Sequence, residues 1–257
     1  MVTKRQKISI SGLILAVSIF FLPEADIKYQ YYLLAVLIVA SYFLSIWSIY
    51  APFAFFELIS LFVLPVFLTS SFALFQIRFE ETLLVRLILA GTYFAVIYTI
   101  LLSENIFNVS TERNIPLVRA AHTVGYLATL FVSFSLFTLI FGLRQNAAIF
   151  SIVVGIAAVF LFAQGFWQIN LKNTIPSQVA LFSLVGGLIV GELALVLSFW
   201  PLDPPKIGLA LTAAVYVILG ILQHYIREDL TRRSIFEYLF VAAAVTLLLA
   251  VSTSWGV

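Results

Sequence analysis

Long apolar runs separated by short polar segments dominate the pattern along this chain. An α-helix needs about 20 apolar residues to cross a bilayer, and nine runs reach or approach that length. None of the polar segments, of which 103–116 is the longest, is long enough to fold alone. We therefore predict an all-α, polytopic transmembrane helix bundle, a single integral membrane domain over 1–257, with spans at about 8–22, 31–50, 53–75, 84–102, 117–142, 147–168, 178–200, 207–226 and 234–254.

The composition supports a membrane protein. Of the 257 residues, 63% are hydrophobic and 10% are charged, whereas a soluble domain carries about 25% charged residues. The net charge of +2 is too small to indicate nucleic-acid binding, so we expect the lipid bilayer and no nucleic acid as a partner. The chain has no cysteine, which excludes disulfides, thiolate metal sites and cysteine nucleophiles.

The first apolar run is similar to a signal peptide, because Lys4, Arg5 and Lys7 precede it. No small-x-small cleavage site closes the run, which ends at Leu22-Pro23. We interpret it as a retained first span. A signal peptide that is removed is the alternative.

The basic residues predict the orientation of the spans. With a cytoplasmic N-terminus, nine of them fall on the inner side: Lys4, Arg5, Lys7, Arg113, Arg119, Lys172, Arg227, Arg232 and Arg233. Five fall on the outer side: Lys28, Arg78, Arg86, Arg144 and Lys206. This bias follows the positive-inside rule and predicts a multi-pass protein with an external C-terminus.

Three prolines indicate a possible repeat of helical hairpins. Pro52, Pro116 and Pro176 each begin an outgoing span at nearly equal spacing, and each outgoing span is followed by an outer turn and a returning span. Proline suits the first turn of a helix because its missing N–H needs no partner there. Ordinary helix-initiating prolines, without duplication, are therefore the alternative to three repeated hairpins.

The fifth span carries a stripe of polar residues on one face. Steps of three and four residues place five side chains on that face: Arg119, His122, Tyr126, Thr129 and Ser133. Such a stripe can hold helices together by hydrogen bonds, or it can line a solvated path. Both interpretations stay open.

The eighth span carries a second stripe of the same kind. Its members again follow at steps of three and four, with His224 beside them: Thr212, Tyr216, Gly220, Gln223 and Arg227. Because lipid cannot satisfy polar side chains, we expect both stripes to face the interior of the bundle.

Glu192 is the most unusual acid, because it lies in the seventh span about 21 Å from Gln178 at 1.5 Å per residue. A lone ionised carboxylate at that depth costs several kcal/mol, so it should be protonated, paired or facing a cavity. The same span carries small residues every four positions, at Ser183, Gly187 and Gly191, which permit close helix approach.

Glu57 and Glu237 lie about one turn inside the inner ends of the third and ninth spans. We expect each to extend towards the membrane surface or to pair with a nearby arginine. A working role for Glu57 in a path through the membrane is the alternative.

The sequence argues against several chemistries. All lysines and aspartates lie at span ends or in connecting segments, which excludes a retinal Schiff base and a pair of buried catalytic aspartates. No catalytic or phosphate-binding motif occurs. We expect no catalytic residues, no cofactor and no metal site, and an enzyme is the less favoured class.

Two functions remain. The first is passage of a small solute, ion or proton along a helix-lined path, with these candidate residues: Glu192, His122, Tyr126, Thr129, Ser133, Tyr216, Gln223, His224 and Glu57. The alternative is a non-catalytic membrane subunit or scaffold that packs against partner membrane proteins or against further copies of the chain. The distinguishing feature is whether Glu192 and the stripes face one cavity or separate helix seams.

Overall fold

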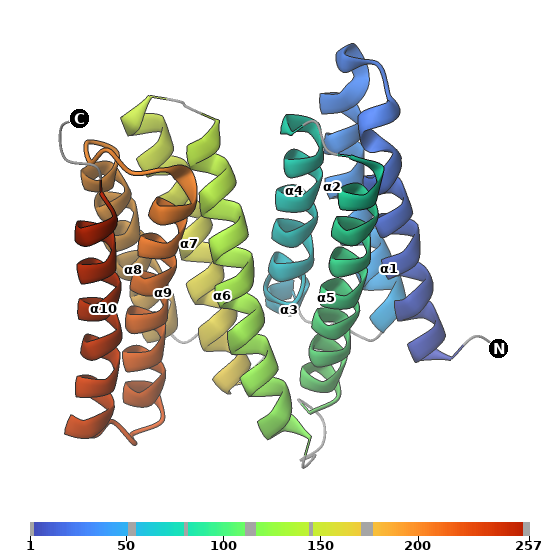
Figure 1. Ribbon diagram of the computed structural model, residues 1–257. Coiled ribbons are helices and arrows are strands. Elements are labelled where there is room, and N and C mark those ends of the chain that lie inside the picture. The colour runs from blue at the N-terminus through green and yellow to red at the C-terminus, as the bar shows by residue number, and fades with distance from the viewer. Residues whose placement is uncertain are drawn as a thin grey trace. The chain divides into compact units, whose positions relative to one another are not determined.

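The computed structural model describes residues 3–50, 55–79, 82–110, 117–143, 146–170 and 177–253. In these ranges the regular structure is helical throughout, and nine helical segments are long and apolar enough to cross a membrane (Figure 1). The all-α polytopic fold is thereby confirmed. Besides a short 3-10 helix at Leu22–Glu24, the helices are α1 Lys4–Phe21, α2 Ile27–Ile49, α3 Phe55–Ser60, α4 Val63–Arg78, α5 Leu83–Ser110, α6 Val118–Gly142, α7 Ala147–Asn170, α8 Ser177–Leu197, α9 Pro204–Ile226 and α10 Arg232–Ser252.

Two elements differ from the spans predicted by hydropathy. Helix α5 continues to Ser110, so the first half of the segment expected to connect two spans is helical. The third span is divided into α3 and α4 by a turn at Leu61 and Phe62. Pro65 follows this turn, and its missing N–H cannot bond to the carbonyl of Leu61, which explains why the helix does not run straight through.

The chain divides into two compact units, Met1–Ala128 and Thr129–Val257, with the division inside α6. Each unit is described on its own below. The expected single membrane domain over 1–257 stays a prediction.

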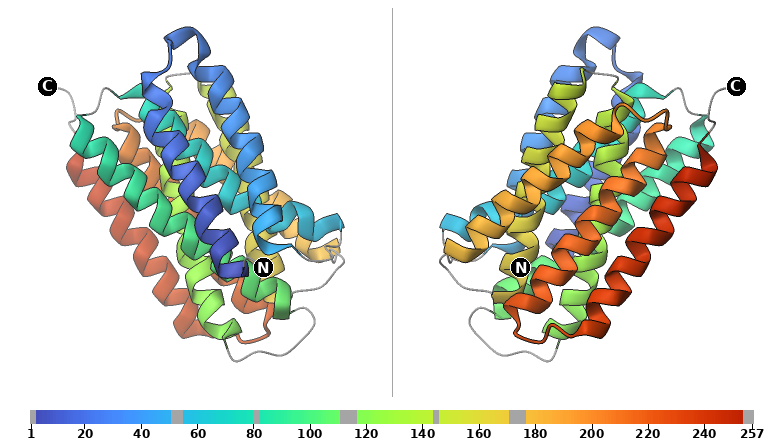
Figure 2. Two further views of the ribbon diagram at one scale, coloured as in Figure 1. Left: turned by 90° about the vertical axis from the view of Figure 1, so that its right-hand side faces the viewer. Right: turned by 90° about the vertical axis from the view of Figure 1, so that its left-hand side faces the viewer.

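In the first unit, four helices pack against one another. Helix α1 packs against α2 and α5, and α4 packs against the same two helices (Figure 2, left). Polar side chains join them: Ser11 donates to the carbonyl of Leu44 at 3.2 Å, and the hydroxyls of Thr69 and Tyr93 lie 2.8 Å apart. These bonds satisfy hydroxyls that lipid would leave unpaired.

In the second unit, α7 packs against α8 and α9, and α9 also packs against α8 and α10 (Figure 2, right). Helix α10 is the most exposed span, and Leu249 is the one buried residue in it. Its C-terminal end is tied to the connection between α8 and α9 and to the first turn of α9: Trp200 donates to the hydroxyl of Thr253 at 3.1 Å, and Lys206 donates to the carbonyl of Ser252 at 2.8 Å.

The three prolines that suggest repeated hairpins lie outside the described residues. Among the described helices, the packing of α7 on α8 joins the second span of one expected hairpin to the first span of the next. The repeat therefore stays a prediction.

Candidate functional site

The seam between α7 and α8 is built from small residues. Gly155 of α7 faces Gly187 and Gly191 of α8 so closely that a Cβ added at Gly187 would lie 2.9 Å from the carbonyl oxygen of Gly155. At one end of the seam Ser151 donates a hydrogen bond to the carbonyl of Gly191 at 2.7 Å. The predicted close approach along Ser183, Gly187 and Gly191 is confirmed, since all three are buried.

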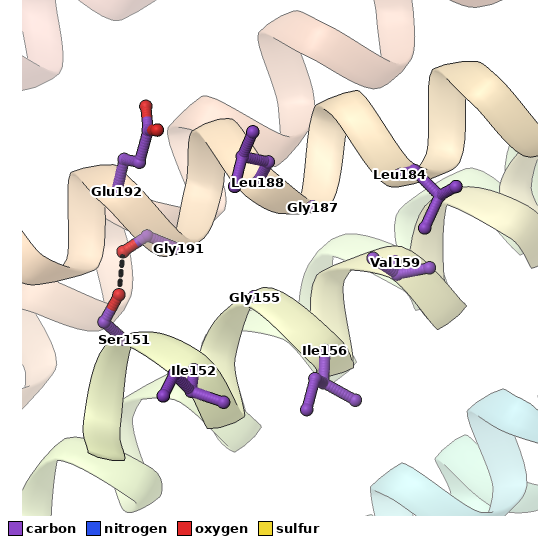
Figure 3. A pocket seen from close by; sticks show the side chains of 10 residues that line it. All are labelled: Ser151, Ile152, Gly155, Ile156, Val159, Leu184, Gly187, Leu188, Gly191 and Glu192. Atoms are coloured by element: carbon purple, nitrogen blue, oxygen red, sulfur yellow. Dashed lines mark hydrogen bonds between the residues drawn. The ribbon is translucent and has the colours of Figure 1, made fainter. Parts of the chain in front are cut away.

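A shallow groove of about 320 Å³ follows this seam (Figure 3). The glycines form its floor because they place no side chain there. Its flanks are the aliphatic side chains of both helices, four of which are more than half exposed: Ile152, Ile156, Leu184 and Leu188. All of the lining residues belong to α7 and α8.

Glu192 lies at one end of the groove. Its side chain is exposed, and its carboxylate points away from α7 (Figure 3). No hydrogen bond or ion pair joins it to any other residue that the structure describes. Arg86, one of the basic residues predicted on the outer side, pairs with Glu24.

Glu192 lies close to the C-terminal end of α8, which ends at Leu197. Five residues separate the two, which is about 8 Å along the helix at 1.5 Å per residue. The acid therefore lies one and a half turns inside this end of the helix, with apolar groove residues towards the other end. A carboxylate at this position is still costly if lipid surrounds it.

The polar stripe predicted in the fifth span lies on α6. Thr129 and Ser133 are fully buried. Thr129 donates to the side chain of Gln164 on α7 at 3.4 Å, and Ser133 donates to the carbonyl of Thr129 at 2.6 Å. Towards the start of the helix, His122 is half-buried with its ring 5.3 Å from that of Phe107, and Tyr126 is half-buried as well.

The stripe predicted in the eighth span lies on α9, where its members contact two different helices. Gln223 donates to the carbonyl of Gly165 on α7 at 3.0 Å. On another side, the ring of Tyr216 lies 5.0 Å from that of Tyr238 on α10. His224 bonds to Asp229 at 2.8 Å, just past the end of its own helix.

The structure brings some predicted site residues together and leaves others apart. Thr129 and Gln223 both bond to α7, at the neighbouring residues Gln164 and Gly165. The groove at Glu192 contains no member of either stripe. Thr129, Gln223 and Tyr216 thus lie in helix seams of the second unit, whereas none of the stripe residues lines the groove of Glu192.

Glu57 on α3 is buried, with 3% of its surface exposed. It therefore does not extend to the surface, and the other expected arrangement, pairing with an arginine, stays a prediction. For Glu237 the expectation is confirmed, because this exposed acid pairs with Arg233 at 2.9 Å.

Sequence reasoning missed a buried polar group near the end of α5. Glu104 is 1% exposed, and its neighbours Ser103 and Asn108 are also buried. Its polar residues predict a connecting segment for this stretch. The signal that could have found it is the spacing of Glu104, Phe107 and Asn108, which places them on one face of a continuing helix.

The described residues contain no group of three or more histidine, aspartate or glutamate side chains placed to hold a metal ion. The groove offers a carboxylate and an apolar trough, which suits an apolar molecule carrying a hydrogen-bonding or cationic group. It contains no nucleophile paired with a base.

Comparison with known proteins gives one match. Residues 51–252 match the model of a family described as "Protein of unknown function (DUF5656)". No curated protein and no solved structure matches the chain. Because the match covers more than half of the sequence, this polytopic helical membrane protein belongs to the DUF5656 family.

Proposed function

We propose that the protein is a non-catalytic membrane subunit that binds another membrane-embedded protein chain through the groove between α7 and α8. The observation that carries this proposal is the exposed carboxylate of Glu192, which has no partner among the described residues and lies beside an apolar groove. Lipid tails cannot satisfy a carboxylate, whereas a polar side chain from a neighbouring helix can.

The polar stripes support the same function. Thr129 of α6 and Gln223 of α9 each make a hydrogen bond to α7, so these two side chains stabilise the packing of α6 and α9 on α7. Such interhelical bonds contribute about 1 kcal/mol or less each. Because these side chains are already bonded within the bundle, Glu192 is the polar group for which a partner chain would supply the hydrogen bond.

Photo-crosslinking in native membranes tests this function. We would place benzoylphenylalanine at Leu188, which lines the groove, and, as the matched control, at Val36, an exposed apolar residue of α2. A discrete protein adduct from position 188, absent from position 36 and lost in Glu192→Leu, is the expected result. Adducts with lipid alone, or an adduct unaffected by Glu192→Leu, would overturn the proposal.

Passage of a small solute, ion or proton is the second candidate. It is favoured by three buried polar atoms of the second unit that find no hydrogen-bond partner among the described residues: Thr138 Oγ1, Gln168 Nε2 and Thr212 Oγ1. Buried polar groups of this kind are commonly satisfied by water, and bound water can form part of a path through a bundle.

A flux assay separates this candidate from the first. Purified protein in liposomes should accelerate the decay of a pH gradient if protons pass through it. Glu192→Gln should then abolish the flux, because it keeps the shape and a donor but cannot release a proton. A stable Glu192→Leu protein with full flux would remove Glu192 from any such path, and no flux with the unsubstituted protein would remove proton passage.

A further inference from the structure

We propose that the occupant of the α7–α8 groove is a second copy of this chain, and that the two Glu192 side chains hydrogen-bond to each other across the dimer interface. The proposal rests on the proposed function and names its partner. The supporting observations are the depth of Glu192, its hydrogen-bonding chemistry and the shape of the groove.

Depth favours a second copy. Two copies inserted with the same topology place residue 192 at the same level of the membrane. A two-fold axis along the membrane normal then brings α8 against α8 of the partner, so that each residue near the axis meets its own equivalent. Another membrane protein would have to carry a suitable polar residue at that level.

Hydrogen-bonding chemistry fits the same arrangement. A protonated carboxylic acid has one donor and an acceptor oxygen, so two such groups facing each other satisfy both donors. Two of the basic residues predicted on the outer side are already paired: Arg86 with Glu24, and Lys206 with Asp203 at 3.4 Å. The self-complementary pair removes the cost of holding an unpaired acid in lipid.

The shape of the groove suits a helix with aliphatic side chains. Leu184 and Leu188 stand on the same side of α8 as Glu192, at intervals of four residues, and both are more than half exposed. In a dimer these leucines pack against the same leucines of the partner copy, directly beside its glycine-floored trough. Attraction between transmembrane helices depends on such close packing together with polar contacts.

Disulfide trapping is the direct test, because the chain contains no cysteine and every cross-link comes from the introduced residue. In native membranes treated with copper phenanthroline, Leu188→Cys should give a disulfide-linked dimer. Val36→Cys on α2 is the matched control for random collision and should give none. Equal yields at the two positions would overturn the proposal.

The Glu192 contact is tested in the Leu188→Cys background. Glu192→Leu should lower the dimer yield about fivefold, as expected for the loss of one hydrogen-bonded contact in a membrane. Glu192→Gln should preserve it, because two amides can also donate to each other. Thermal unfolding of each variant in detergent shows that the fold is intact, and an unchanged yield with Glu192→Leu would contradict the acid pair.

Co-expression of two differently tagged copies distinguishes failure of this proposal from failure of the proposed function. A photo-crosslinked product from position 188 that carries both tags supports the dimer. A Glu192-dependent product with a different membrane protein and no second tag overturns the dimer and leaves the subunit function standing. Products with lipid alone overturn both.

Discussion

Glutamates within the helical spans occupy opposite environments. Glu57 and Glu104 are almost fully buried and engaged in interactions, whereas Glu192 is exposed beside an apolar groove. A buried acid with partners contributes to stability, since removing it leaves those partners unsatisfied. An exposed acid without a partner contributes little to the stability of the single chain.

Replacing these acids by leucine should therefore give different results. Glu104→Leu should lower the free energy of unfolding by about 1–3 kcal/mol, because it leaves polar partners without their acid. Glu192→Leu should leave it unchanged or raise it, as replacement of a poorly solvated carboxyl group by an apolar residue often does. Thermal unfolding in detergent measures both, and similar losses for the two variants would contradict the assigned environments.

The Thr69–Tyr93 pair gives a second prediction at this scale. Tyr93 is fully buried, and its hydroxyl lies 2.8 Å from that of Thr69. Tyr93→Phe should destabilise the protein by about 1 kcal/mol, the size of an interhelical hydrogen bond in a membrane. Tyr98→Phe, at a half-buried position of the same helix, is the control and should have less effect on the unfolding temperature.

At the scale of elements, the α7–α8 seam depends on glycine. A Cβ at Gly187 would lie 2.3 Å from Cγ2 of Val159, so the two helices would have to separate. We predict that Gly187→Ala lowers the free energy of unfolding by about 1–3 kcal/mol through overpacking.

Gly91 of α5 provides the matched control, because a Cβ there meets nothing within 4 Å. Gly91→Ala should be neutral or stabilise the helix by up to about 1 kcal/mol, since alanine is the better helix former. Denaturation of both variants compares the two sites. Equal destabilisation would mean that loss of glycine itself, and not the helix contact, is the cause.

Much of the element structure could be predicted from hydropathy, because a span must be both long and apolar. The end of α5 could not, since Glu104 and Asn108 have the composition of a connecting segment although they are buried in a helix. The site was only partly predictable. The small residues of α8 indicated a close seam, but the direction of Glu192 could not be read, because faces towards lipid and towards protein are both apolar in a membrane helix.

At the scale of the whole molecule, the orientation in the membrane is the main prediction to test. The nine-to-five division of basic residues predicts a cytoplasmic N-terminus and an external C-terminus. Since 103–110 is helical, the inner reporter belongs within 111–116 and the outer one after Trp255. Reporter activity should place the two sites on opposite sides of the membrane, and activity on the same side would contradict the topology.

The exposed last span has a consequence for biosynthesis. Helix α10 buries Leu249 alone, and the bonds of Thr253 and Ser252 that fasten its far end involve Trp200 and Lys206, which are synthesised earlier. When α10 leaves the translocon, the rest of the second unit can already have packed. Because α10 buries so little of its surface against that unit, packing cannot draw the helix into the bilayer. Its own transfer free energy from water to lipid must do so. A single charge introduced at Leu248 would therefore disturb insertion before it disturbed the packing of any other helix.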